Sequence, residues 1–201
     1  MWMDSVNSTN DAVRSRIQAF DNMSAVAAVE QTSGRGQGDH TWYSPKGENI
    51  NVSALLKFST DSQPGFLRRL PVSEAILLTC CTTLGIKDYL LEKEVDSRIK
   101  WPNDIWVGDR KICGILIENT LEKDSIRSSI IGIGFNLNTS VWPEELPNPV
   151  SLRELTGDVY DVRRETGILV DKISRRILQM EDSDGRNSLQ GEFDENMFRL
   201  P

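Results

Sequence analysis

Hydrophobic positions recur along this chain with two spacings, and the spacing separates expected strands from expected helices. From 49 to 58 every second residue is apolar, which is the period of a strand with one buried face. Short apolar runs predict five more strands, over 25–29, 99–101, 105–107, 111–118 and 129–138. Because Gly108 and Asp109 suit a tight turn, the strands on either side of them are expected to pair as an antiparallel hairpin.

Apolar residues spaced three or four apart predict helices. The first begins after Ser8, a good N-cap, and is expected to bury Val13, Ile17 and Phe20. Further helices are expected after Pro71, at the capping-box pair Ser151 and Glu154, over 163–180, and from about 187 to the terminus. The mixture indicates an α+β fold, with a mixed, largely antiparallel sheet packed with helices.

Two segments are predicted to be loops, 32–47 and 142–149. In the first, the run Gly34 to Asp39 has glycine at alternate positions but lacks the Gly-Lys-Ser/Thr ending of a Walker loop. Asp39 also stands where a dinucleotide fingerprint needs its third glycine. What remains is a flexible backbone around Arg35, suited to folding over an anion, with a plain mobile surface loop as the alternative.

Composition narrows the classes of function. With 201 residues, 38% of them hydrophobic, the chain has enough apolar material for a sizeable core in one large or two small domains. A net charge of −7 and a pI near 4.9 disfavour general binding to nucleic acid. His40 is the single histidine, so zinc sites with two or three imidazoles are excluded and a Ser-His-Asp triad would have to use His40.

Cysteine content and apolar runs bear on the compartment. Cys80, Cys81 and Cys113 are odd in number and two are adjacent, so reduced thiols in a cytoplasmic protein are expected. No apolar run approaches the ~18 residues of a membrane span, and the N-terminus lacks the regions of a signal peptide. We therefore expect no membrane partner.

Two lysines are candidates for binding an anion. Lys100 ends an apolar strand, and a buried ammonium there would need a ligand anion or a carboxylate such as Asp104 or Glu118. Lys111 follows a hairpin turn, where a lysine is ordinarily solvated.

Two glycines within a predicted strand are a further candidate feature. Gly132 and Gly134 mark either the close approach of a ligand or a plain bulge, and Asn136 at the strand's end is placed to hydrogen-bond such a ligand.

Six sequence blocks follow one another along the chain. They are Asp4 to Asn10, Glu30 to Gln37, Trp42 to Pro45, Lys100 to Asp104, Lys111 to Glu118 and Gly132 to Asn138. In this order they closely resemble biotin protein ligases, also called biotin–[acetyl-CoA-carboxylase] ligases. The resemblance covers about residues 4 to 150 and, more loosely, the helices beyond. It implies the class II synthetase-like catalytic fold that biotin and lipoate ligases share.

The resemblance implies a two-step reaction. The carboxylate of biotin attacks the α-phosphate of ATP to give biotinyl-5′-AMP and pyrophosphate, and a lysine of a biotin carboxyl carrier protein then takes the biotinyl group. Mg²⁺ would arrive with the ATP phosphates, without dedicated metal ligands in the protein. An acyl-adenylate is already activated, so the enzyme positions the reactants and excludes water, and no catalytic histidine is needed.

The resemblance also implies roles for particular residues. Lys100 and Arg35 are the implied catalytic groups, with the charge of Lys100 placed where the carboxylate and the α-phosphate meet. The implied biotin-binding residues are Ser8, Thr9, Asn10, Gln31, Arg35, Gly36, Gln37, Lys100 and Gly114. The implied nucleotide-binding residues are Arg35, Gln37, Trp42, Asn103, Lys111 and Asn136.

Domain organisation is expected from the same resemblance. Residues 1–185 would form the catalytic domain, and 186–201 a terminal helix leading to a small SH3-like domain that this chain does not contain. No DNA-binding domain precedes Ser8, so a ligase-only type with no nucleic-acid partner is expected. Many family members carry a second basic residue and then glycine after the Gly-Arg-Gly core, where this chain has Gln37, Gly38 and Asp39, and the smaller positive charge would weaken retention of the adenylate.

Two other functions remain open. A lipoate ligase shares the fold and the adenylate chemistry, and a non-catalytic module would bind biotin without activating it. The Gly-Arg-Gly loop and the Lys-Trp-Pro-Asn-Asp block favour biotin. A homodimer is left open.

Overall fold

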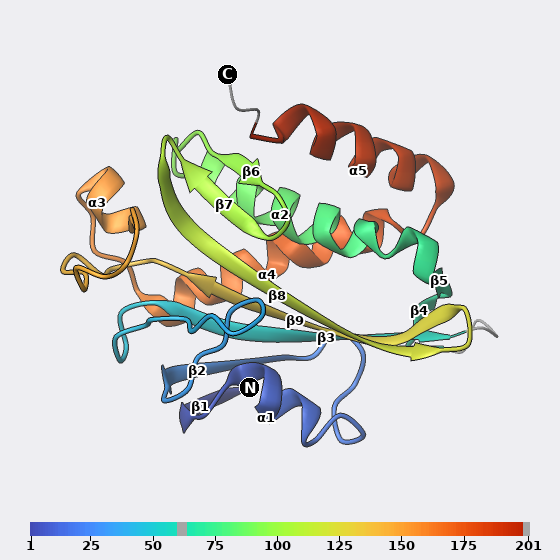
Figure 1. Cartoon of the computed structure of the whole chain (residues 1–201). Coiled ribbons are helices and arrows are strands. Elements are labelled where there is room, and N and C mark those ends of the chain that lie inside the picture. Colours follow the sequence, from blue (N-terminus) through green and yellow to red (C-terminus); the bar gives the residue numbers. More distant parts are fainter. Residues whose placement is uncertain (60–63, 199–201) are drawn as a thin grey trace.

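The computed structural model describes residues 1–59 and 64–198, and its strands form one central sheet (Figure 1). The strands are β1 (Trp2–Val6), β2 (Ala25–Gln31), β3 (Ile50–Ser59), β4 (Leu67–Arg68), β5 (Leu70–Pro71), β6 (Arg98–Lys100), β7 (Asp104–Val107), β8 (Arg110–Glu122) and β9 (Ser125–Phe135). Their order is β1-β2-β3-β9-β8-β7-β6, with β4 beside β3 and β5 beside β9. Among the described residues β1–β2 and β3–β4 pair in parallel and the other pairs are antiparallel, so the predicted α+β class is confirmed.

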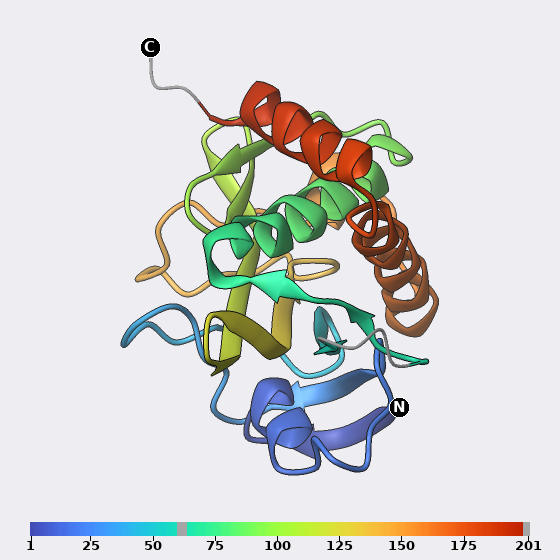
Figure 2. The ribbon, with the colours of Figure 1, turned by 90° about the vertical axis from the view of Figure 1, so that its right-hand side faces the viewer.

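Helices cover both faces of this sheet. They are α1 (Thr9–Arg14), α2 (Ile76–Leu91), α3 (Leu152–Thr156), α4 (Val162–Gln179) and α5 (Ser183–Asn196), with a 3-10 turn (Val72–Glu74) before α2. The helices α2, α4 and α5 lie on one side, and α1 lies against the sheet near β1 and β2 (Figures 1 and 2). In the described ranges, no helix is long and apolar enough to cross a membrane.

Two apolar clusters follow from this layering. The larger one fills the space between the sheet and α2 and α4, where Tyr89 and Phe135 meet edge to face at 5.4 Å between ring centroids. The smaller one joins Val13 of α1 to Leu55 and Ile130 on the opposite face of the sheet. The sequence predicts one buried face for β3, but both faces are buried because α1 and the residues around it cover the second.

Most predicted elements are present. The hairpin across Gly108, whose φ is +58°, is confirmed as β7 and β8. The capping box of Ser151 and Glu154 is confirmed at α3, and the expected helix over 163–180 is α4. All three cysteines are free, which agrees with the expected reduced thiols, and all three are buried.

Several boundaries were not predicted correctly. The strands β1, β4 and β5 were not expected, and β8 and β9 extend toward each other until two residues separate them. The last helix begins at Ser183 and not near 187, and residues 199–201 of the expected terminal segment lie outside the described residues. The first helix ends at Arg14 because the following turns use bonds to the third preceding residue, such as Arg16 N–H to the Val13 carbonyl.

Two helix glycines give a test of how closely α2 and α4 pack. A Cβ on Gly85 of α2 would lie 2.6 Å from the Cα of Ile173, so Gly85→Ala is expected to lower the free energy of unfolding by about 1–3 kcal/mol. Gly167 of α4 has open space around it, so Gly167→Ala is expected to raise that free energy by about 0.5–1 kcal/mol. Urea unfolding of both variants measures the difference, and equal stabilities would show that the helices separate without cost.

Candidate functional site

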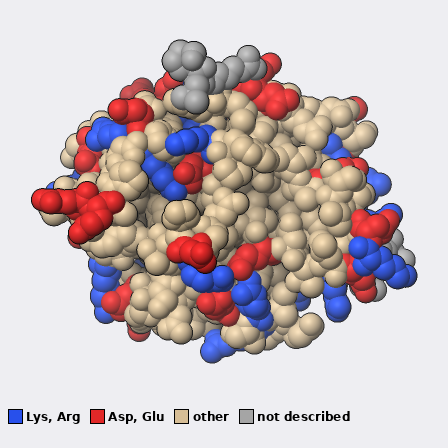
Figure 3. All heavy atoms as spheres, in the orientation of Figure 1, with Lys and Arg blue, Asp and Glu red and all other residues tan. Residues whose placement is uncertain are grey.

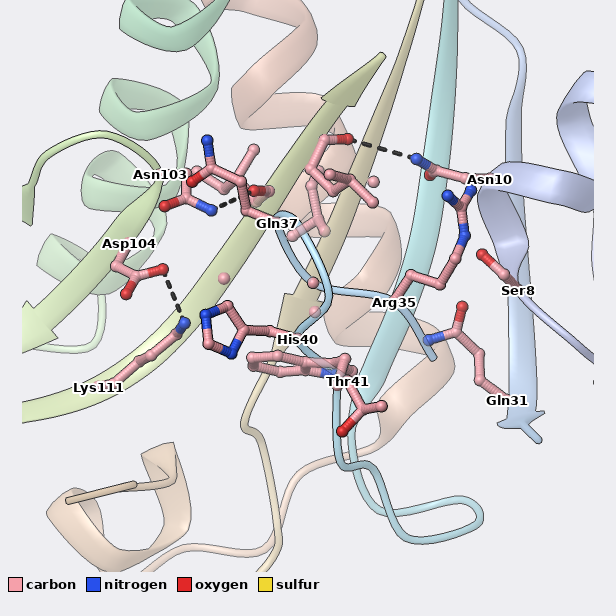
Figure 4. A pocket seen from close by; sticks show the side chains of 18 of the residues that line it. Ser8, Asn10, Gln31, Arg35, Gln37, His40, Thr41, Asn103, Asp104 and Lys111 are labelled. Atoms are coloured by element: carbon pink, nitrogen blue, oxygen red, sulfur yellow. Dashed lines mark hydrogen bonds and ion pairs between the residues drawn. The ribbon is translucent and has the colours of Figure 1, made fainter. Parts of the chain in front are cut away.

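A cavity of about 610 Å³ opens on the side of the sheet that carries α1 (Figure 4). Its lining includes all of the predicted site residues except Asn136, namely Ser8, Thr9, Asn10, Gln31, Arg35, Gly36, Gln37, Trp42, Lys100, Asn103, Lys111 and Gly114. The structure thus brings together side chains that the sequence distributes over more than a hundred positions. Their individual roles stay predictions.

The register of the sheet builds the bottom of this cavity. Across β3, β9, β8, β7 and β6, the residues directly opposite one another are Asn51, Gly134, Gly114, Asp104 and Lys100. A neighbouring row, two positions along each strand, holds Ser53, Gly132 and Leu116. Side chains alternate along a strand, so both rows face the same side. We call Gly114, Gly132 and Gly134 the glycine floor, because their missing side chains leave space above the sheet.

One end of the cavity carries uncharged hydrogen-bonding groups. The side-chain oxygen of Gln31 accepts a bond from the Thr9 backbone N–H at 2.8 Å, and its amide nitrogen donates to Asn51 Oδ1 at 3.2 Å. Ser8 occupies the N-cap position of α1, but its hydroxyl makes no capping bond, nor a hydrogen bond to any other described residue. This end therefore presents an ordered amide and a free hydroxyl to a ligand.

Asn10 is held rigidly at the same end. Its Oδ1 accepts a hydrogen bond from Ser53 Oγ at 2.5 Å, and its Nδ2 donates to Glu118 Oε2 at 2.7 Å. A Cβ on Gly132 would lie 2.4 Å from Asn10 Oδ1, so glycine is required there for Asn10 to stay in place. Asn10 thus fixes the first turn of α1 on the glycine floor.

The opposite end of the cavity is charged. Lys111 Nζ lies 2.7 Å from Asp104 Oδ1 and 5.6 Å from the centroid of the Trp42 ring. Figure 4 shows Asn103, Asp104 and Lys111 on one side of the cavity and Ser8, Asn10, Gln31 and Arg35 on the other. Ser8 and Gln31 thus present neutral groups on one side and Lys111 presents an ammonium on the other, while Arg35 on the first side is paired with Asp11 and Glu118.

Lys100 differs from its prediction. The sequence suggests a buried ammonium that needs an anion, but Lys100 is exposed and its Nζ lies 3.7 Å from the centroid of the Trp106 ring. Neither Asp104 nor Glu118 pairs with it. The reason is its position on β6, the last strand of the sheet, where the side chain remains open to solvent. The side chain of Lys111 is less accessible, at 32%.

The predicted glycine loop is present and folds back on itself. Gly36 N–H donates to the His40 carbonyl at 2.7 Å, and Trp42 N–H donates to the Gly34 carbonyl at 2.9 Å. The Trp42 indole lies on the glycine floor, since a Cβ on Gly134 would be 2.2 Å from its Cε2. Arg35 turns toward α1, where its Nη2 lies 2.8 Å from Asp11 Oδ1.

Asn136 lies outside the cavity lining. It is buried, and its amide donates to the carbonyls of Lys111 and Val150 at 3.2 and 3.1 Å. This geometry holds the chain that follows β9 against β8, and it leaves the amide already engaged. The expected direct contact with a nucleotide is not supported by this placement.

Gly132 and Gly134, which the sequence marks as a place of ligand approach or a bulge, also line the cavity. The lining residues that were not predicted from the sequence are His40, Thr41, Asp104, Trp106, Ile115, Leu116, Ile133, Pro147 and Asn148. For Asp104, Ile115, Leu116 and Ile133 a signal existed, because they belong to the blocks that carry the resemblance. Pro147 and Asn148 come from a loop in which nothing local indicates a site.

The described part of the chain holds a buried thiol next to the cavity lining and no cluster of metal-ligating side chains. Burial raises the pKa of the Cys113 thiol, which lies in β8 beside Gly114, so it stays protonated at neutral pH. Across residues 1–59 and 64–198 no group of three or more His, Cys, Asp or Glu side chains is placed to hold a metal ion.

On the face drawn in Figure 3, basic and acidic side chains are interspersed.

Comparison with known proteins agrees with this geometry. Residues 2–136 match the biotin/lipoate A/B protein ligase family. The chain belongs to this family. The bifunctional ligase/repressor BirA of Bacillus subtilis is 33% identical over 140 residues, which are 68% of this chain and 40% of that protein. The biotin–[acetyl-CoA-carboxylase] ligase of Paracoccus denitrificans is 26% identical over 183 residues, covering 87% of this chain and 71% of that protein.

A solved structure of the family has the same fold. The biotin protein ligase of Aquifex aeolicus in complex with biotin and ATP superposes with a TM-score of 0.79 at 26% identity, covering 100% of this chain and 78% of that one. The expected class II synthetase-like ligase fold is thereby confirmed. The chain spans about 40% of the length of its Bacillus relative.

Proposed function

We propose that this chain activates biotin with ATP to form biotinyl-5′-AMP and transfers the biotinyl group to a lysine of a biotin carboxyl carrier protein. The observation that carries the proposal is the arrangement of the cavity, with the neutral hydrogen-bonding groups of Ser8 and Gln31 at one end and the ammonium of Lys111 at the other. Arg35, at the first end, is paired with Asp11 and Glu118. Family membership and the Paracoccus denitrificans and Aquifex aeolicus proteins, which are named biotin ligases, support the proposal.

The cavity matches the parts of biotin in order. A ureido ring is neutral and both donates and accepts hydrogen bonds, as the Ser8 hydroxyl and the Gln31 amide do. The apolar middle of biotin would lie beside Leu116 and the Trp42 indole, which itself covers part of the glycine floor. Its carboxylate would then point toward Lys111 and Lys100, where the phosphates of ATP also find positive charge.

The first step needs charge compensation more than proton transfer. A carboxylate oxygen of biotin forms a bond to the α-phosphorus, and the bond from that phosphorus to the bridging oxygen of pyrophosphate breaks. Lys111 is the better-placed cation for this event, because Asp104 orients it and because it is less exposed than Lys100. Lys100, at the rim, would contact the outer phosphates, and Mg²⁺ would be bound by these phosphates as part of the ATP substrate.

The second step depends on keeping water away from the adenylate. The loop containing Gly36, Gln37 and Trp42 lies over the cavity and is suited to shielding the mixed anhydride. A carrier lysine amine then bonds to the carbonyl carbon, AMP leaves, and the amine loses its proton to solvent. We place this reaction in the cytoplasm.

The test is biotin-dependent exchange of labelled pyrophosphate into ATP. With Mg²⁺ present, the chain is expected to catalyse exchange with biotin and not without it, because formation of the adenylate is reversible. Thermal unfolding with biotin or lipoate in parallel is expected to show a larger rise in Tm with biotin.

Each alternative function predicts a different pattern in these assays. Exchange and stabilisation with lipoate in place of biotin would identify a lipoate ligase. Stabilisation by biotin without any exchange would identify a non-catalytic binding module. Either result contradicts the proposal.

A further inference from the structure

Glu118 lies just beyond the cavity lining and contacts two segments that form it. It is on β8, two residues from Leu116 and on the same face of the sheet. Its carboxylate oxygens lie 2.6 Å from Arg14 Nη2, 2.7 Å from Asn10 Nδ2, and 3.2 and 3.3 Å from the guanidinium of Arg35. One carboxylate thus joins α1, the glycine loop and a central strand.

The surroundings of Glu118 keep it charged. Burial by itself raises its pKa, but hydrogen bonds from Arg14, Asn10 and Arg35 outweigh this effect and hold the pKa below its usual value. Because the pKa of Glu118 is lowered in the folded state, these hydrogen bonds contribute fully to the free energy of unfolding at pH values above the ordinary pKa of a glutamate. This contribution to stability is lost as the pH falls through the lowered pKa, so Glu118 is charged at neutral pH.

The tip of the glycine loop has few other attachments. Within residues 33–41 as the structure describes them, Arg35 alone has a side chain hydrogen-bonded or ion-paired to the remainder of the protein. Of its two carboxylate partners, Asp11 is 48% exposed and Glu118 is 24% exposed. Ion pairs are screened more strongly when they are exposed, so Glu118 is the stronger partner.

We propose that Glu118 is a positioning residue, which holds Asn10 and the glycine loop, through Arg35, in one arrangement before biotin binds. The proposal rests on the proposed function, since it concerns the same cavity. It makes the loop partly closed in the free protein, which lowers the ordering cost of ligand binding. Glu118 itself touches no reacting atom.

The first experiment measures the loop without any ligand. In Glu118→Gln, which keeps the shape but removes the charge, amide hydrogen exchange over residues 34–42 is expected to be at least about fivefold faster than in the native protein. The matched control is Glu30→Gln. Glu30, on β2, forms an ion pair at 3.4 Å with Lys46, which lies in the predicted loop 32–47 but outside residues 34–42. This control is expected to leave exchange at 34–42 unchanged.

The second experiment separates positioning from chemistry. In pyrophosphate exchange, Glu118→Gln is expected to raise KM for biotin about tenfold and to leave kcat within about twofold, since only binding has to order the loop. A large fall in kcat with unchanged KM would overturn the proposal. So would unchanged hydrogen exchange at 34–42 in a folded variant.

Failure of the two ideas can be told apart. A loosened loop in a protein that neither binds nor activates biotin would support the role of Glu118 and contradict the proposed function. If Glu118→Gln does not fold, Arg35→Gln removes the same contact together with the Arg35–Asp11 pair and is expected to speed hydrogen exchange at least as much. An unchanged loop in that variant would overturn the proposal.

Discussion

Lys111→Ala is expected to reduce biotin-dependent pyrophosphate exchange by about 100-fold or more, the scale measured for loss of one well-placed charge-stabilising donor. Lys111 lines the cavity, paired with Asp104 and close to the glycine floor, since a Cβ on Gly114 would be 3.3 Å from its Nζ. Lys100→Ala is expected to cost only about tenfold, because Lys100 is exposed and would act on outer phosphates.

The control for this comparison is a positively charged side chain on the sheet but outside the cavity. Arg127 is exposed on β9 outside the cavity lining, and Arg127→Ala is expected to leave exchange unchanged. Asp104→Asn is expected to fall between the two lysine variants, because it removes the group that orients Lys111 without removing the charge. A greater loss in Lys100→Ala than in Lys111→Ala would restore the assignment that the sequence favours.

The exposure of Lys100 and Lys111 could not be predicted from the sequence. Both occur in motifs, and both were expected at the site. Which of them is shielded depends on strand order, since β6 is at the edge of the sheet and β8 is inside it. The pairing of Asp104 with Gly114 comes from the register of β7 against β8, which a reader of the sequence could not fix.

Elements that depend on neighbouring residues in the chain could be predicted from the sequence, whereas elements that depend on pairing with distant residues could not. The capping box at Ser151 and the turn at Gly108 depend on neighbours in the chain, and both are confirmed. The strand β1 was missed because Trp2–Val6 has no clear period and becomes a strand by pairing with β2, more than twenty residues away. Likewise, Ser8 was expected as a cap, but its hydroxyl remains available at the cavity.

Gly132→Ala is expected to weaken biotin binding by about 100-fold, the effect of displacing a positioned group by about 1 Å. The added Cβ would lie 2.4 Å from Asn10 Oδ1, and Asn10 is only 2% exposed, so it has no room to retreat. Asn10 would have to give up its bonds to Ser53 and Glu118, and the turn that presents Ser8 would move with it. Titration calorimetry with biotin measures the loss.

A double-mutant cycle identifies the cause of that loss. If the clash with Asn10 is responsible, Gly132→Ala should cost much less affinity in an Asn10→Ser background, where a shorter side chain leaves space for the Cβ. Gly191→Ala in α5, where nothing lies within 4 Å of the new Cβ, is expected to leave biotin binding unchanged. Additive costs in the cycle would mean that Gly132 acts on the ligand directly. The glycine floor would then be a contact surface at this position and not a support for the first turn of α1.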